Sequence, residues 1–253
     1  MAAPELVTEA VVLGSVDYGD ADRVVTLLSE ARGRISAFAA GARKSKRRFA
    51  GVLEPFTVLD ARLAERRGGD LLFLNSATIV DAHAGLREDL GRIAHAGHAA
   101  ELCRELTRGG QPQPELYARI RGYLGTLASS PARPEDLLAF ELGALGDTGV
   151  APRLDACAIC DGEVADLAPF DPGHGGFLCG GCERAAYPGA IRVDATARAA
   201  LARLQEAGPF AGVELAHPGT RAAVRAVVRR FTREILGKNL RSLEVMQQLG
   251  IEG

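Results

Sequence analysis

Four of the chain's five cysteines stand in two closely spaced pairs. Cys157 and Cys160 form the stretch CAIC, and Cys179 and Cys182 form CGGC after 18 intervening residues. A gap of two residues lets both sulfurs of one tight turn reach the same tetrahedral ion at about 2.3 Å, and the second turn supplies the other two corners. The spacing therefore predicts a zinc site with four cysteine ligands.

The surrounding residues favour a structural role for this site over a catalytic one. Four cysteines fill every position around a tetrahedral ion, whereas a catalytic zinc keeps one position open. A thioredoxin-like redox pair needs a βαβ context, which is absent here. The deaminase signature is absent too, since Ala156 rather than Pro precedes Cys157 and no histidine has Glu two residues later. An iron–sulfur cluster, which uses the same four thiolates, stays open as an alternative.

The cysteines lie in a segment, residues 149–189, that is rich in Gly, Pro and Asp. Its glycines allow backbone amides to approach the sulfurs closely. Few of its side chains are large and apolar, so it has little with which to build a core. We therefore expect this segment to draw its folding free energy from metal binding.

The densest run of positive charge is GARKSKRRF, residues 41–49, which we call the basic loop. Five of its nine residues are cations: Arg43, Lys44, Lys46, Arg47 and Arg48. Such a density between strands predicts a phosphate-binding loop, although a solvated turn has the same composition. Phe49 directly follows two arginines, so we expect it to stack on a nucleic-acid base, whereas Phe38 and Phe56 are expected to pack inside the fold.

A second group of cations recurs every four residues late in the chain: Arg221, Arg225, Arg229 and Arg233. On a helix this spacing makes one basic stripe, which is a second phosphate track, a docking face for an acidic partner or a solvated face.

Three acids stand close together in the stretch DYGDAD, residues 17–22: Asp17, Asp20 and Asp22. They lack EF-hand spacing and are expected to shape a turn. Phosphate-loop, dinucleotide, zinc-protease and nucleophile-elbow motifs are all absent. We therefore expect no enzymatic activity.

Five short runs rich in Val, Leu, Phe and Thr fill the first 80 residues. They lie at residues 7–14, 22–30, 34–41, 53–63 and 70–80, separated by Gly, Asp or charged turns. Runs of about eight residues with β-branched side chains are typical of strands. Five such strands predict a small barrel, and both the OB fold and an SH3-like barrel fit the pattern.

The apolar period changes to that of helices after residue 84. Apolar side chains recur at steps of three and four in residues 86–106, 114–128, 134–149, 195–208 and 219–240. Cys103 lies on the first of these apolar stripes and is expected in the core. We expect solvated or capping roles for His95 and His98, because no carboxylate or cysteine stands where it could complete a metal site with them.

Composition and charge are those of a globular protein, with 47% hydrophobic and 25% charged residues. The net charge of -2 hides an uneven distribution. The first 67 residues carry 11 Lys and Arg against 9 Asp and Glu, whereas residues 68–185 carry 9 against 17. This asymmetry favours a local polyanion site. We expect no signal peptide and no membrane span, and therefore a cytoplasmic location.

Several stretches follow one another in a characteristic order: GARKSKRRFAGVLEPFTVLDARL, LREDLGRI, GVAPRLDACAICD, GGFLCGGC and KNLRSLEVMQQL. Over nearly the whole chain this order resembles the bacterial RecO family of recombination mediator and repair proteins. Its most specific parts are the basic loop leading into LEPF and the P-x-L-D-x-C-x-x-C segment. The resemblance implies a multi-domain α+β fold. It places an OB-fold β-barrel in residues 1–82, an all-α helical domain in 83–152 and 189–253, and an inserted four-cysteine zinc-finger segment in 153–188.

The resemblance also implies a non-enzymatic DNA-binding activity. A RecO-like protein binds single- and double-stranded DNA, anneals complementary strands and, with RecR, helps RecA replace single-strand-binding protein, so that the RecA filament is an indirect partner. For this chain the resemblance assigns DNA contacts to the loop cations, to Arg23 and to Arg34. It assigns one structural zinc ion to the four paired cysteines, and implies a cytoplasmic, nucleoid-associated location. The rival hypothesis is a zinc-stabilised protein-interaction scaffold with only incidental DNA contact.

Overall fold

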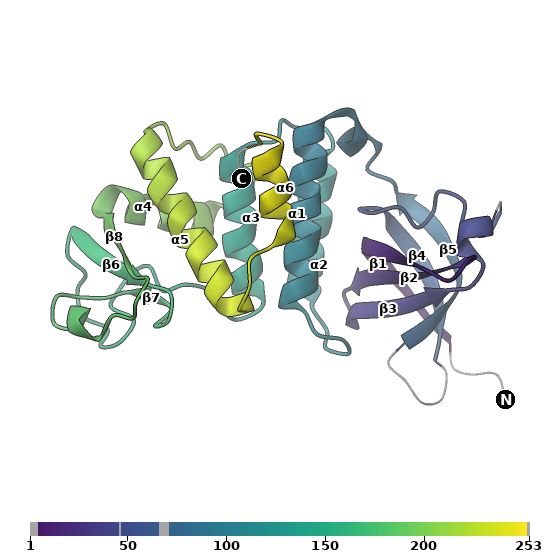
Figure 1. Cartoon of the computed structure of the whole chain (residues 1–253), viewed down its shortest axis with the longest axis horizontal. Coiled ribbons are helices and arrows are strands. Elements are labelled where there is room, and N and C mark those ends of the chain that lie inside the picture. The colour runs from purple at the N-terminus through teal and green to yellow at the C-terminus, as the bar shows by residue number, and fades with distance from the viewer. Residues whose placement is uncertain (1–4, 46, 66–70, 252–253) are drawn as a thin grey trace. The chain divides into compact units, whose positions relative to one another are not determined.

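The computed structural model of the chain describes residues 5–45, 47–65 and 71–251. The chain divides into two units, Met1–Pro131 and Ala132–Gly253. The described part of the first unit holds a β-barrel and two α-helices, and that of the second holds four α-helices and a small sheet (Figure 1). The barrel carries the basic loop, and the small sheet carries the cysteine pairs.

The barrel is closed by five strands. These are β1 (Glu5–Tyr18), β2 (Asp22–Ser29), β3 (Gly33–Ala39), β4 (Val58–Ala64) and β5 (Leu71–Asp81). They close in the order β1-β2-β3-β5-β4, and all neighbours are antiparallel except β3 and β5. The five apolar runs predicted a small barrel, and its strand order makes it OB-like, as the family resemblance implied. The SH3-like alternative is set aside.

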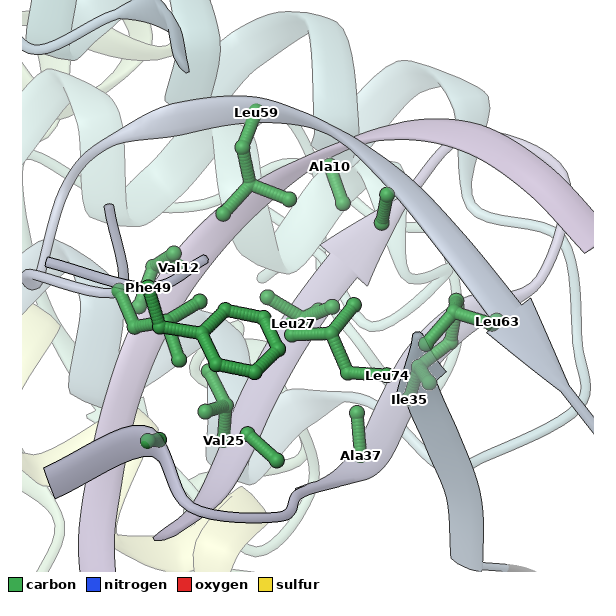
Figure 2. Close-up of a cluster of buried hydrophobic side chains, with 14 residues drawn as sticks. Ala10, Val12, Val25, Leu27, Ile35, Ala37, Phe49, Leu59, Leu63 and Leu74 are labelled. Atoms are coloured by element: carbon green, nitrogen blue, oxygen red, sulfur yellow. The ribbon is translucent and has the colours of Figure 1, made fainter. Parts of the chain in front are cut away.

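Alternation along the strands separates the barrel core from its outer face. On β3 the side chains of Ile35, Ala37 and Ala39 are buried, while Ser36 between them is exposed. The inward-facing side chains make one apolar cluster that fills the barrel (Figure 2). A register shift between Val12 and Gly14 marks a bulge in β1, the strand that pairs with both β2 and β4.

Two helices complete the first unit: α1 (Leu90–Leu106) and α2 (Pro114–Leu127). The expected helix from residue 86 is divided, because Asp89 caps α1 by accepting a hydrogen bond from the backbone N–H of Arg92 at 2.8 Å. Cys103 is buried, as expected. The expectation for His95 and His98 was wrong, since both are fully buried on the packed side of α1.

The second unit is built around α3 (Pro134–Asp147). Every residue from Glu135 to Leu145 is buried, which is the pattern of a helix surrounded on all sides. Three more helices follow: α4 (Ala195–Ala207), α5 (Pro218–Leu236) and α6 (Arg241–Gln248). The helical periods predicted α3, α4 and α5 to within a few residues, whereas α6 is a short helix that no period had indicated.

A three-stranded sheet holds the cysteine-bearing segment. Its strands are β6 (Leu167–Asp171), β7 (Gly176–Phe177) and β8 (Ile191–Asp194), in the order β7-β6-β8. Phe170 and Phe177 are fully buried, with ring centroids 5.2 Å apart, and Phe170 also meets Phe231 of α5 at 6.1 Å. The segment therefore does bury a core, and the expectation that it has too few apolar side chains to build one was wrong. Stabilisation of the segment by metal stays a prediction.

Candidate metal centre and nucleic-acid surface

The four paired cysteines converge on one point. Their Sγ atoms all lie within 4.8 Å of one another, and those of Cys160 and Cys179 are 3.6 Å apart. Bonds of about 2.3 Å to a tetrahedral ion place sulfurs about 3.8 Å apart. The four sulfurs are thus spaced to hold a metal ion. No other group of His, Cys, Asp or Glu within the described ranges has this geometry.

The first pair sits in a turn closed by its own backbone. The N–H of Asp161 donates to the carbonyl of Cys157 at 3.1 Å, and Asp161 has a left-handed φ of 61°. A Cβ on Gly162 would lie 3.2 Å from the sulfur of Cys160. Glycine at that position therefore leaves room for the sulfur to point towards the other three.

The second pair sits in a similar turn, and β7 joins the first turn to the sheet. The N–H of Cys182 donates to the carbonyl of Cys179 at 3.0 Å. From the first turn, the N–H of Ala158 donates to the carbonyl of Phe177 at 2.8 Å. Because Phe177 belongs to the small apolar core, that core helps to position the sulfurs.

The thiols at this point differ in their affinity for protons. Burial raises the pKa of the Cys157 thiol, but hydrogen bonds from the backbone of Cys179, Ile159 and Cys160 outweigh it and lower the pKa to about 6. Hydrogen bonding to Cys160, followed by burial, raises the pKa of Cys182 to about 12. Cys157 therefore favours the thiolate, whereas the raised pKa values of Cys160 and Cys182 favour their protonated forms. A bound cation would replace those protons, because metal binding requires deprotonated sulfurs.

The basic loop is tied to the barrel by hydrogen bonds. The N–H of Gly41 donates to Asp22 Oδ1 at 2.7 Å. Ser45 Oγ accepts hydrogen bonds from the backbone N–H groups of Arg48 and Phe49, both at 3.0 Å. The turn expected around Asp17, Asp20 and Asp22 is present at residues 19–21, but Asp22 bonds to the basic loop and not within that turn. The loop thus presents its cations from a bonded backbone.

Asp17 joins two arginines at the edge of the basic loop. Its carboxylate lies 3.0 Å from Nε of Arg23 and 3.2 Å from Nε of Arg43. Arg23 also lies 3.9 Å from Glu54. The pairing of Asp17 with Arg23 follows from their opposite positions in the β1–β2 register, which the sequence alone did not reveal. These two predicted contacts therefore carry less net positive charge than their residue types suggest.

Lys44 and Arg47 are different, because both are exposed and neither pairs with a carboxylate in the described part of the chain. Arg48 donates to the carbonyl of Ala40, and its guanidinium carbon lies 4.5 Å from the centre of the Phe49 ring. Lys46 lies outside the described residues. Among the described loop cations, Lys44 and Arg47 are the most available to an anionic ligand.

Two other residues that were predicted to contact DNA, Phe49 and Arg34, make contacts within the first unit instead. Phe49 is 4% exposed and fills the barrel core, because the Ser45 turn directs its ring inward (Figure 2). Its predicted stacking on a base conflicts with this position. Arg34 Nη1 donates to the carbonyl of Arg104 at 2.7 Å, near the C-terminus of α1, where a cation is favourable. Arg34 is thus committed to a contact within the first unit.

The prediction for Phe38 was wrong in the opposite direction from that for Phe49. Phe38 was expected inside the barrel, yet it is half-buried on the outer face, where its ring contacts those of Tyr18 and Phe73. Phe56 is half-buried. The strand alternation on β3 is the signal that places Phe38 outside, because its neighbours Ala37 and Ala39 are both fully buried.

The late basic stripe is partly used within the second unit. Arg221 of α5 lies 3.2 Å from Glu135 of α3, whose side chain is 6% exposed. Burial, followed by the nearby charge of Arg225, lowers the pKa of Arg229, while Glu141 opposes this shift. The stripe is therefore not a uniformly solvated face, since Arg221 balances a buried acid and Arg229 is itself half-buried.

Comparison with known proteins agrees with this architecture. Residues 1–83 match the family described as "Recombination protein O N terminal", and residues 87–244 match "Recombination protein O C terminal". The chain belongs to the RecO family. DNA repair protein RecO of Anaeromyxobacter dehalogenans is 51% identical over 95% of both chains. DNA repair protein RecO of Myxococcus xanthus is 45% identical over 96% of this chain and 98% of its own.

RecO of Geobacter sulfurreducens, also named a DNA repair protein, is 41% identical over 71% of this chain and 74% of its own. The resemblance inferred from the basic loop and the cysteine segment is thus confirmed, and the chain is a member of a family of DNA repair proteins. Within the described residues, no helix has both the length and the apolar character needed to cross a membrane.

Proposed function

We propose that this chain is a non-enzymatic recombination mediator that binds and anneals single-stranded DNA. The basic loop carries the proposal. It offers exposed cations, Lys44 and Arg47, that no described carboxylate neutralises, from a backbone hydrogen-bonded to an OB-like barrel. Arg43 and Arg48 flank them, Arg23 lies beside them, and Lys46, outside the described residues, belongs to the same proposed set. Arg34 and Phe49 are left out because the fold uses both.

Annealing follows from charge neutralisation. Two complementary strands repel each other through their phosphates, and cations that neutralise those phosphates reduce the repulsion. Bases that are not buried by the protein stay free to pair. No bond is made or broken in this mechanism, so the barrel needs neither a nucleophile nor a general base.

The metal proposed for the four cysteines is one structural zinc ion. Four sulfurs within 4.8 Å of one another, in two turns joined through β7, match the geometry that zinc prefers. Bound zinc would cross-link the two turns. The ligands are Cys157, Cys160, Cys179 and Cys182. Because all four corners are occupied by cysteine, we assign this site to stability.

The proposal extends to partners and location. The chain would act on DNA covered by single-strand-binding protein and, with RecR, help to load RecA. It would do so in the cytoplasm, in association with the nucleoid. In this scheme residues 1–82 bind DNA, residues 83–152 and 189–253 form the helical domain, and residues 153–188 form the zinc-bearing insertion.

A strand-annealing assay tests the proposal. Complementary labelled oligonucleotides are mixed with wild-type protein or with a loop variant in which Lys44, Lys46, Arg47 and Arg48 are Ala. Wild type should speed annealing most at low salt, and the variant should lose most of this effect while keeping its melting temperature. Equal annealing by both proteins would instead support the scaffold hypothesis, provided that wild type pulls down RecR and single-strand-binding protein and variants of the four paired cysteines do not. Strand cleavage by wild type would contradict both.

A further inference from the structure

An apolar row crosses the outer face of the barrel. Val16, Val24, Phe38 and Phe73 are paired in register on four neighbouring strands, β1, β2, β3 and β5. Tyr18 lies two residues beyond Val16. The Phe38 ring centroid is 5.8 Å from that of Tyr18 and 5.4 Å from that of Phe73, both in edge-to-face geometry. We call these five residues the aromatic face.

The aromatic face lies on the surface of the first unit. Tyr18 is 61% exposed and Val16 is 65% exposed, while Val24, Phe38 and Phe73 are half-buried. The side of a barrel strand that faces water is normally polar, because the other side supplies the core. A contiguous apolar surface at this place is therefore typical of a binding site.

Cations border this face on one side. Arg43 lies 3.2 Å from Asp17 and donates to the carbonyl of Gly19 at 2.8 Å, and these two residues flank Tyr18 in the chain. Lys44 follows Arg43 directly, and Arg23 precedes Val24. The aromatic rings and the basic loop therefore meet at the β1–β2 turn, so that one ligand could contact both.

A single-stranded nucleic acid has the chemistry to match both parts. Its phosphates are anionic and its unpaired bases present flat aromatic surfaces, which stack on protein rings whatever their sequence. A duplex offers the same phosphates but keeps its bases stacked inside the helix. An apolar protein segment would match the rings but would leave the adjacent cations without a partner.

We infer that the aromatic face stacks on unpaired bases, with Tyr18 as its main stacking ring, while the basic loop binds the phosphates of the same strand. This inference rests on the proposed DNA-binding function and adds the residues that distinguish single strands from duplexes. Few rings are available, so only a few bases are held at once and the remaining bases of the strand stay free to pair.

Replacing Tyr18 by Ser is the first test, because this exposed ring can be removed without opening the core. Affinity for a labelled oligothymidylate should fall roughly tenfold, while affinity for a duplex and the salt dependence of both should stay unchanged. Lys44→Ala should instead weaken both ligands and reduce the salt dependence. Tyr187→Ser is the matched control, since Tyr187 is 57% exposed and lies in the second unit.

A fluorescence experiment reports the stacking itself. The sequence contains no tryptophan, so Tyr18→Trp introduces the only indole in the protein. Its emission should be quenched by oligothymidylate and not by a duplex, whereas the emission of Tyr187→Trp should respond to neither. An unquenched Trp in the Tyr18→Trp protein, when that protein binds the oligonucleotide, would overturn the inference.

The two proposals fail in different ways. If wild type binds the oligonucleotide and loses affinity in the Lys44→Ala variant, yet Tyr18→Ser binds as tightly as wild type, the stacking inference is wrong and the proposed function stands. If wild type does not bind the oligonucleotide at low salt, both are wrong.

Discussion

Replacing Asp17 by Asn should strengthen the binding of single-stranded DNA. This carboxylate pairs with Nε of Arg23 at 3.0 Å and with Nε of Arg43 at 3.2 Å, so it reduces the charge that both arginines offer to phosphates. Asparagine keeps an oxygen that can accept a hydrogen bond from one of them. The substitution therefore removes a negative charge while leaving part of the arrangement in place.

The size of the effect follows from charge alone. Repulsion between the carboxylate and a phosphate about 7 Å away is about 0.6 kcal/mol in bulk water, which is about a threefold change in affinity. Counterion release gives a similar figure. One more neutralised phosphate of a single strand steepens the slope of log K against log salt by about 0.7, which raises the affinity about fivefold at about 0.1 M salt. We expect a gain of about three- to fivefold for Asp17→Asn.

Fluorescence anisotropy of a labelled oligothymidylate measures this gain. Asp20→Asn is the control, because Asp20 lies three residues after Asp17 and has no ion pair within the described residues. It should change affinity by less than about twofold, since Asp20 neutralises no described arginine and its exposed charge is largely screened by water and salt. An unchanged or weaker affinity of Asp17→Asn, or equal gains in both variants, would refute the proposed role of this pair.

Three further predictions concern the folded state. Phe49→Ala should lower the free energy of unfolding by about 3–5 kcal/mol in urea titrations, because it empties the barrel core, whereas Arg48→Ala should cost less than about 1 kcal/mol. Arg221→Met should cost about 1–3 kcal/mol by leaving buried Glu135 without its cation, and should cost less in a Glu135→Gln background, where the hydrogen bond from Arg221 to the carbonyl of Leu215 is still lost. Metal analysis should find one zinc ion in wild type and less in Cys160→Ser, and wild type should lose zinc as the pH falls, because protons compete for the thiolates.

The barrel strands and most of the helices could be predicted from local patterns. β-branched runs between turn residues marked the five strands, and apolar steps of three and four marked α1 to α5. Apart from α3, which is buried on all sides, these elements bury one regular side, so their sequences carry the period. The four-cysteine metal site was equally predictable, because the geometry of the metal constrains the spacing of its ligands in the sequence.

Other features depend on partners distant in the sequence. The small sheet was missed because β7 has two residues and Phe170 gains its burial from Phe177 and from Phe231, far along the chain. Phe49 looked exposed because two arginines precede it, yet the Ser45 turn directs its ring into the barrel. The pairing of Asp17 with two arginines likewise depends on the β1–β2 register and on how the basic loop returns to this turn.

The most direct test of phosphate neutralisation by the basic loop is the salt dependence of oligothymidylate binding. Anisotropy titrations between about 50 mM and about 200 mM salt compare wild type with a Lys44→Ala, Arg47→Ala double variant. The logarithm of the association constant should fall linearly with the logarithm of salt concentration, and the slope for the variant should be shallower by about 1.4, for two lost phosphate contacts. Equal slopes for the two proteins, or no binding by wild type at the lowest salt, would contradict phosphate neutralisation by the basic loop.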